Sequence, residues 1–340
     1  MTQAVTRIGL LDLMQGVRRA GVLRAGMKLN IFDGLADGRT DPETLAEWAG
    51  LPVRGVRVLL NALAAIGILE REDDRFLLAE GASELLVTGS PGYFGHAMKL
   101  AGSDYEWEAL ASLAEAVQAD GTVLEENAET PGFGYWEDFA VSPTGKTQPM
   151  ADLMAEVLLK RSGTRPALDV LDVACGHGMY GYALAARDRR VRVWDVDWPN
   201  VLDIAEEHAR RLGVADSVNR IPGDMFTVPL GGPYDITIIT NVLHHFSRAR
   251  AAEMIQRLGE VTKPDGRVAV VTISADARPP ADNPVPHLFS ALMLTWTREG
   301  EAHPVSDYAQ MLAEGGFTVP EMYQVPGVPL TLLVADRRAR

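Results

Sequence analysis

The sequence of 340 residues lacks several features that would each indicate a class of protein. It contains one cysteine, Cys175, which excludes an intrachain disulfide framework and favours a reducing compartment. No run approaches the roughly 20 apolar residues that a membrane-spanning helix needs. Residues 1–21 also lack the successive charged, apolar and small-residue regions of a signal peptide. We therefore expect a soluble, cytoplasmic protein without membrane association.

Basic residues are also scarce. The chain has 32 Lys and Arg against 46 Asp and Glu, which gives a formal net charge of −14. Such a field repels phosphate backbones, so no nucleic-acid partner is expected. The composition is otherwise that of a globular protein, with 47% hydrophobic and 23% charged residues. The length allows two domains.

Apolar periodicity predicts helices within residues 8–36, followed by helices over about 42–50 and 53–67. Asp41 is placed to cap the second of these segments, with Pro42 at its first position. Residues 68–78 then read as a short β-hairpin, which completes the layout of a winged helix. Only Arg54 and Arg57 are basic in the segment where a DNA-reading helix would lie, so we expect a buried dimer contact there instead of a DNA reader.

The order of the predicted helices and strands divides the chain into three regions. These are a winged-helix domain over 1–90, a helical linker rich in aromatics over 91–165, and an α/β domain over 166–340. In the last region short apolar strands alternate with helices, which predicts a mostly parallel sheet covered on both faces. The expected strands are 169–173, 191–196, 219–222, 235–240, 266–273 and a C-terminal pair near 323–324 and 330–335.

The strongest local signal is a buried strand that runs into a glycine-rich turn at the start of a helix, over residues 170–181. Gly176 and Gly178 permit a tight turn and a close backbone approach to a ligand. Alone, such a turn is a weak signal that would also suit a dinucleotide, or be a plain turn between a strand and a helix.

Polar clusters follow the next three strands. Asp195 and Asp197 end the second strand, where a carboxylate can accept hydrogen bonds from both hydroxyls of a ribose. Gly223–Phe226 (G-D-M-F) follows the third strand and Thr240–Ser247 the fourth. All four clusters are expected at the carboxyl ends of consecutive strands, where open α/β sheets bind ligands.

With these segments the sequence resembles class I methyltransferases of the plant caffeate and hydroxyindole O-methyltransferase type and their bacterial natural-product relatives. Asp197–Val201 (D-W-P-N-V) is similar to that family's D-L-P-x-V, and Gly223–Phe226 to its G-D-M-F. The resemblance covers nearly the whole chain. It implies a Rossmann-like domain with a seven-stranded, mostly parallel sheet, S-adenosylmethionine (SAM) as cofactor, and a homodimer formed through the winged-helix domain. The implied cofactor residues are Asp172, Gly176, Gly178, Gly181, Asp197, Trp198, Gly223, Asp224, Met225, Phe226 and Asn241.

The same resemblance implies that His244, in Leu243–Phe246 (L-H-H-F), is the base that takes a proton from the acceptor. The surroundings depart from the family pattern. The acid that follows the fifth strand is missing, with Ser274 or Asp276 as substitutes. The position of the family's second acid is occupied by Ala302, beside Glu301. The position of the lysine that usually precedes the motif is occupied by Thr240.

The expected function is O-methylation of a small aromatic or polyketide-like acceptor. Two alternatives stay open: SAM used for C-methylation or for a pericyclic, decarboxylating or hydroxylating step, and a winged-helix regulator that senses a metabolite. No metal-ligand spacing is present, so no metal is expected. By resemblance the acceptor pocket comprises Tyr135, Trp136, Met150, Met154, His245, His287, Phe289 and Met293, although aromatic and methionine residues at this spacing are equally typical of a core.

Overall fold

The computed structural model describes residues 5–141, 147–275 and 278–338. The chain divides into two compact units, Met1–Asp104 and Tyr105–Arg340. Within the described residues no helix is long and apolar enough to cross a bilayer.

The first unit is a helical domain with a small hairpin. Its elements are α1 (Arg7–Lys28), α2 (Ile31–Ala36), α3 (Pro42–Ala49), α4 (Val53–Ala65), β1 (Leu69–Glu72), β2 (Arg75–Leu78), α5 (Ala82–Leu86) and α6 (Gly95–Ala101). The predicted cap is present: the Asp41 carboxylate accepts a hydrogen bond from the Thr44 amide at 2.9 Å. The α3–α4 pair followed by the hairpin confirms the predicted winged-helix layout.

The core of the first unit lies among α2, α3 and α4, with Phe32, Leu45 and Leu60 fully buried. The first part of α1 does not share it. Ile8, Leu13 and other apolar residues of that segment are exposed, Leu13 to 74%. This long apolar surface is unusual for a helix that faces only water.

Helices open the second unit, as predicted for residues 91–165. They are α7 (Asp104–Ala111, which begins at the unit boundary), α8 (Leu113–Ala119), α9 (Tyr135–Val141) and α10 (Thr147–Lys160). A loop that includes Gly121 and Gly132 separates α8 from α9. Residues 142–146, between α9 and α10, lie outside the described residues.

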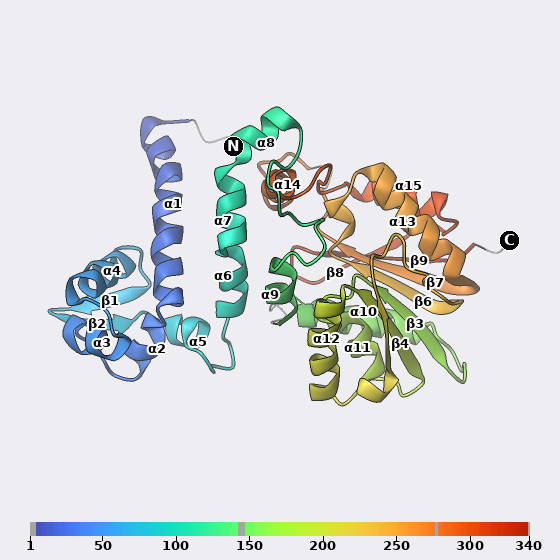
Figure 1. Cartoon of the computed structure of the whole chain (residues 1–340), viewed down its shortest axis with the longest axis horizontal. Helices are drawn as coiled ribbons and strands as arrows, with labels where there is room; N and C mark the ends of the chain where they lie inside the picture. The colour runs from blue at the N-terminus through green and yellow to red at the C-terminus, as the bar shows by residue number, and fades with distance from the viewer. Residues whose placement is uncertain (1–4, 142–146, 276–277, 339–340) are drawn as a thin grey trace. The chain divides into compact units, whose positions relative to one another are not determined.

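A seven-stranded sheet follows, with the order β5-β4-β3-β6-β7-β9-β8 (Figure 1). The strands are β3 (Leu168–Val173), β4 (Val191–Asp197), β5 (Val218–Pro222), β6 (Tyr234–Thr240), β7 (Thr262–Thr272), β8 (Glu321–Gln324) and β9 (Thr331–Asp336). The pairs from β5 to β7 are parallel, and β9 runs antiparallel to both of its neighbours. The predicted mostly parallel sheet with a C-terminal antiparallel edge is confirmed.

Helices α11 (Met179–Ala185) and α12 (Pro199–Arg211) cover one face of this sheet together with α10, and α13 (Arg248–Val261) and α15 (Val305–Glu314) cover the other. The remaining elements are α14 (Val285–Trp296), which contacts α8, and the short η1 (Ala215–Ser217) and η2 (Leu243–His245). Because side chains alternate along a strand, Val170 packs on one face and Leu171 on the other. One core contains α10, α11 and α12, and the second contains α13 and α15.

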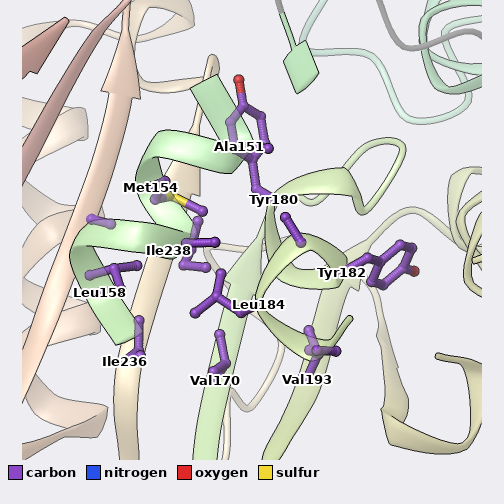
Figure 2. Packing of buried hydrophobic residues seen from close by; sticks show 14 of the residues in the cluster. Ala151, Met154, Leu158, Val170, Tyr180, Tyr182, Leu184, Val193, Ile236 and Ile238 are labelled. Atoms are coloured by element: carbon purple, nitrogen blue, oxygen red, sulfur yellow. The ribbon is translucent and has the colours of Figure 1, made fainter. Parts of the chain in front are cut away.

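Figure 2 shows the first of these cores, where Met154 and Leu158 of α10 face Ile236 and Ile238 of β6. The chain passes from β3 outward to β4 and β5 on one side of the sheet, and then returns to place β6 on the other side of β3. The strand order therefore reverses between β3 and β6. Ligands of open α/β sheets bind beyond the strand ends at such a reversal. The fold therefore places a binding site beyond the ends of β3, β4 and β6.

Candidate functional site

A cavity of about 950 Å³ lies at this position, entirely within the second unit. One part of its wall comes from the segments that follow β3, β4, β5 and β6. The other part comes from α9, α14 and the loops beside them. The lining includes Tyr135, Trp136, Phe139, Gly176, His177, Asp197, Trp198, Gly223, Asp224, Met225, Phe226, Asn241, His244, His245, Phe289, Met293 and Trp296.

The turn after β3 is held in a conformation that needs glycine. Gly176 has φ +55° and Gly178 has φ +72°, in the left-handed region that other residues seldom adopt. A β-carbon at Gly178 would lie 2.2 Å from the ring of Tyr182, so no side chain fits there. The Gly181 amide donates to the Asp172 carboxylate at 3.0 Å, which joins the start of α11 to the end of β3.

Asp197 at the end of β4 faces this turn. One carboxylate oxygen accepts a hydrogen bond from the Gly176 amide at 2.8 Å and the other from the Trp198 amide at 2.7 Å. Burial raises the pKa of Asp197 to about 6, although both hydrogen bonds oppose the shift. Asp197 thus supplies a half-buried carboxylate to the wall of the cavity.

Asp195 lies two residues earlier and does not line the cavity. Its carboxylate accepts a hydrogen bond from the Tyr182 hydroxyl at 2.6 Å, and its second oxygen has no partner among the described residues. Burial raises the pKa of Asp195 to about 7. This placement agrees with a structural role for Asp195.

The segment after β5 lies at one end of the cavity. The Asp224 carboxylate accepts from the Phe226 amide at 2.8 Å, and Met225 adds an apolar side chain to the wall. The Phe226 ring packs edge-on against Phe246 at 5.0 Å, and the Arg250 guanidinium lies 3.7 Å from its centroid. An acid beside apolar surface suits a flat nitrogen heterocycle.

Asn241, after β6, has φ +52°, and its amide group donates a hydrogen bond to the Tyr180 hydroxyl at 3.4 Å. It lies in the wall together with His177, whose ring stacks on Phe139 at 5.5 Å. Sequence reasoning did not single out Tyr180 or Phe139 as site residues. Only their positions, in the helix after the glycine turn and four residues after Tyr135, indicate them.

Aromatic rings build the other end of the cavity. Tyr135 and Trp136 of α9 meet edge to face at 5.3 Å, and Trp296 of α14 contacts Tyr135 at 4.6 Å. Trp136 also lies 5.2 Å from the ring of His245. Phe289 and Met293, from α14, complete this wall. Its shape and apolar character suit a flat, apolar ligand.

His244 lies in the same wall and is buried. Its ring packs edge-on against His245 and against Phe289, both at 4.7 Å. Its Nδ1 atom has no hydrogen-bond partner among the described residues. Burial, with smaller contributions from His245 and His303, holds the pKa of His244 well below its ordinary value.

Among the described substitutes for the missing acids, none hydrogen-bonds the Nδ1 atom of His244. The Ser274 hydroxyl hydrogen-bonds the Thr331 hydroxyl at 3.1 Å, and Glu301 is exposed. Ala302 is buried but has no polar group to offer. Asp276 lies outside the described residues.

Several residues predicted for the site do not line the cavity. Asp172, Gly178 and Gly181 lie behind the glycine turn, where they shape it. Met150 and Met154 are fully buried in the core that α10 forms with the sheet, and neither lines the cavity. His287 is exposed on α14. Trp296, which sequence reasoning omitted, belongs to the wall.

The residues of the cavity fit SAM. Asp197 offers a carboxylate for ribose hydroxyls, and Asp224 with Met225 and Phe226 offers an acid and apolar contacts for adenine. The turn at Gly176 gives the cofactor close access to the backbone. Among the described residues no group of three His, Cys, Asp or Glu side chains could hold a metal ion.

Residues 110–318 match the family model of the O-methyltransferase domain, and residues 11–89 match that of the O-methyltransferase dimerisation domain. The chain belongs to the O-methyltransferase family. The predicted methyltransferase activity and fold are thereby confirmed, and the family supports SAM as the methyl donor.

Individual proteins agree with the family match. The chain is 25% identical to the 3-hydroxy-5-methyl-1-naphthoate 3-O-methyltransferase of Streptomyces sahachiroi, over 90% of this chain and 88% of that one. A solved structure described as an O-methyltransferase of Nostoc punctiforme aligns with a TM-score of 0.90 at 26% identity, over 98% and 100% of the two chains. Human N-acetylserotonin methyltransferase, solved in complex with SAM, shares the fold with a TM-score of 0.76 at 21% identity, over the full length of both chains.

Proposed function

We propose that this methyltransferase transfers the methyl group of SAM to a hydroxyl of a flat, aromatic or polyketide-like natural product. One observation supports this proposal above the others. A single cavity joins the acidic strand ends at Asp197 and Asp224 to the aromatic wall at Trp136 and Phe289. A cofactor and an acceptor bound in these two parts would meet beside His244. The naphthoate substrate in the name of the Streptomyces sahachiroi relative belongs to the same chemical class.

The cofactor would lie against the strand ends. Asp197 would accept hydrogen bonds from the ribose, Asp224 would contact the adenine beside Met225 and Phe226, and Gly176 would pass close to the methionine portion. Trp198, Gly223 and Asn241 complete the contacts proposed for this part of the wall. When bound, SAM supplies a methyl group on a positively charged sulfur, which needs no further activation.

The chain's own residues would then align an oxygen with that methyl group and remove a proton. Trp136, Phe289 and Met293 would hold the acceptor ring, with His245 beside it. His244 would contact the acceptor hydroxyl and receive its proton. Since no described carboxylate orients its ring, this base acts without the charged partner that would stabilise an imidazolium.

The N-terminal region would join two copies of the chain. The match to the dimerisation domain over residues 11–89 and the exposed apolar residues of α1 support a homodimer formed through this unit. We propose the functional division 1–90 for dimerisation, 91–165 for a helical linker that contributes to the acceptor pocket, and 166–340 for cofactor binding and catalysis, in a cytoplasmic enzyme.

The test combines binding and turnover on the purified full-length protein. Calorimetric titration with SAM is expected to give saturable binding. Incubation with SAM and a panel of hydroxylated naphthalenes and quinones is expected to give S-adenosylhomocysteine and methylated product in equal amounts. Product without consumption of SAM would refute methyl transfer. Absence of SAM binding would refute the cofactor assignment as well.

A further inference from the structure

The ring of His244 is a buried polar group with one nitrogen that lacks a hydrogen-bond partner among the described residues. The residue is only 3% exposed, and this nitrogen is Nδ1. Buried polar atoms nearly always have a partner, so the unpaired Nδ1 shows that no described group orients the ring from that side. The residue also lines the cavity, where an acceptor hydroxyl would meet the other side of its ring.

No described group around His244 would stabilise a positive charge on its ring. From η2 the neighbour is His245, from α14 it is Phe289, and from the loop before α15 it is His303, whose Nε2 lies 3.0 Å from the Phe246 carbonyl oxygen. Glu299 and Arg298 line the same cavity, and Glu301 is exposed. None of these carboxylates hydrogen-bonds the His244 ring, so an imidazolium there would be buried without a counter-charge.

We propose that the acceptor of this enzyme carries a hydroxyl that is already strongly acidic: a hydroxyquinone, the enol of a β-diketone, or a phenol conjugated to a carbonyl group. This inference rests on the proposed function and narrows its substrate class. A base that resists protonation removes a proton efficiently only when the acceptor gives it up readily. In the step itself, the oxygen's electron pair forms the new O–C bond and the pair of the broken C–S bond stays on sulfur. The proton passes to His244 and then to water.

Two acceptors of similar size and different acidity test the proposal: a hydroxynaphthoquinone and a naphthol. At about pH 6.5, near the ordinary pKa of histidine, kcat/KM for the hydroxynaphthoquinone is expected to exceed that for the naphthol at least about tenfold. As the pH rises, the rate with naphthol should increase, and the inflection should follow the pKa of each acceptor. Equal rates, or one inflection near the ordinary histidine pKa for both acceptors, would overturn the proposal.

The variant His244→Gln separates a base from a residue that only shapes the wall. Its kcat should fall about 100-fold with the naphthol but less than about tenfold with the acidic acceptor, because the second needs less help with its proton. His96→Gln, the same substitution in the first unit, serves as the control. An equal loss with both acceptors would contradict the proposal.

The protonation state of His244 can also be measured without turnover, so that this test does not depend on the choice of acceptor. In ¹⁵N-histidine NMR of the full chain, the His244 resonance, assigned by its loss in His244→Gln, should remain that of a neutral ring as the pH falls through the ordinary histidine pKa, because burial lowers the pKa of His244. Titration near that ordinary value would overturn the inference while leaving methyl transfer intact. Bound SAM with no turnover of either compound would overturn the aromatic acceptor class itself, and the inference with it.

Discussion

The carboxylate of Asp197 accepts a hydrogen bond from the backbone amide of Gly176 at 2.8 Å, across the ends of two neighbouring strands. The bond joins the end of β4 to the glycine turn after β3. A carboxylate has capacity for further hydrogen bonds, so Asp197 can hold the turn and still accept from a bound sugar. The site is therefore already organised by the residue that we propose as its main polar contact.

Replacement of Asp197 tests this assignment. Asp197→Ala should weaken SAM binding about 10- to 100-fold, since hydrogen bonds to a charged group contribute about 1.5–3 kcal/mol. Calorimetric titration would measure the affinity, and circular dichroism would check the fold. Asp195→Asn is the matched control, because Asp195 contacts Tyr182 outside the cavity. It should lower thermal stability with little effect on affinity. Unchanged affinity in both Asp197→Ala and Asp224→Ala would refute the cofactor site.

The affinity for SAM should also depend on pH. Burial raises the pKa of Asp197 to about 6, so the carboxyl group takes up a proton as the pH falls through that value. The ionised form accepts hydrogen bonds from the ribose and favours a cationic ligand. Affinity should therefore be highest above about pH 7 and fall by up to about tenfold per unit below about pH 6.

The pH series has an internal control in Asp197→Asn, which keeps the shape and removes the charge. Its affinity should be lower and nearly independent of pH over the same range, because the carboxyl group that titrates near pH 6 is gone. Titrations in buffers of different ionisation enthalpy should show proton release on binding below about pH 6 for the wild type. Proton uptake there would contradict the sign of the coupling.

Much of this architecture could be predicted because it depends on local patterns. Alternating apolar strands and helices fixed the sheet, and the segments Asp197–Val201 and Gly223–Phe226 indicated where a nucleoside would bind. The acceptor wall was harder to predict. Met150 and Trp136 both occur in helices rich in apolar residues, and only the way each helix packs in the fold decides that one is core and the other lines the cavity.

That difference between cavity and core can be tested with one residue of each kind. Trp136→Ala should raise KM for the acceptor about tenfold or more, because it removes a large aromatic surface from the wall. Met154→Ala, in the core between α10 and β6 (Figure 2), should lower the free energy of unfolding by about 2–5 kcal/mol. Steady-state kinetics and denaturant unfolding distinguish the two. If Met154→Ala changed the KM for the acceptor and left the free energy of unfolding unchanged, Met154 would have to be assigned to the acceptor pocket and not to the core.

The exposed apolar surface of α1 is where we expect the second copy of the chain to bind. Leu13 is 74% exposed and Met14 70% exposed, on a helix within the segment that matches a dimerisation domain. If a second copy covers this surface, Leu13→Glu would bury a charge without a partner and weaken the dimer about tenfold or more. Gln15→Glu adds the same charge at an exposed polar position of α1 and should weaken it less. Sedimentation velocity over a range of concentrations would measure both. A dimer equally stable in wild type and Leu13→Glu would mean that another surface joins the copies.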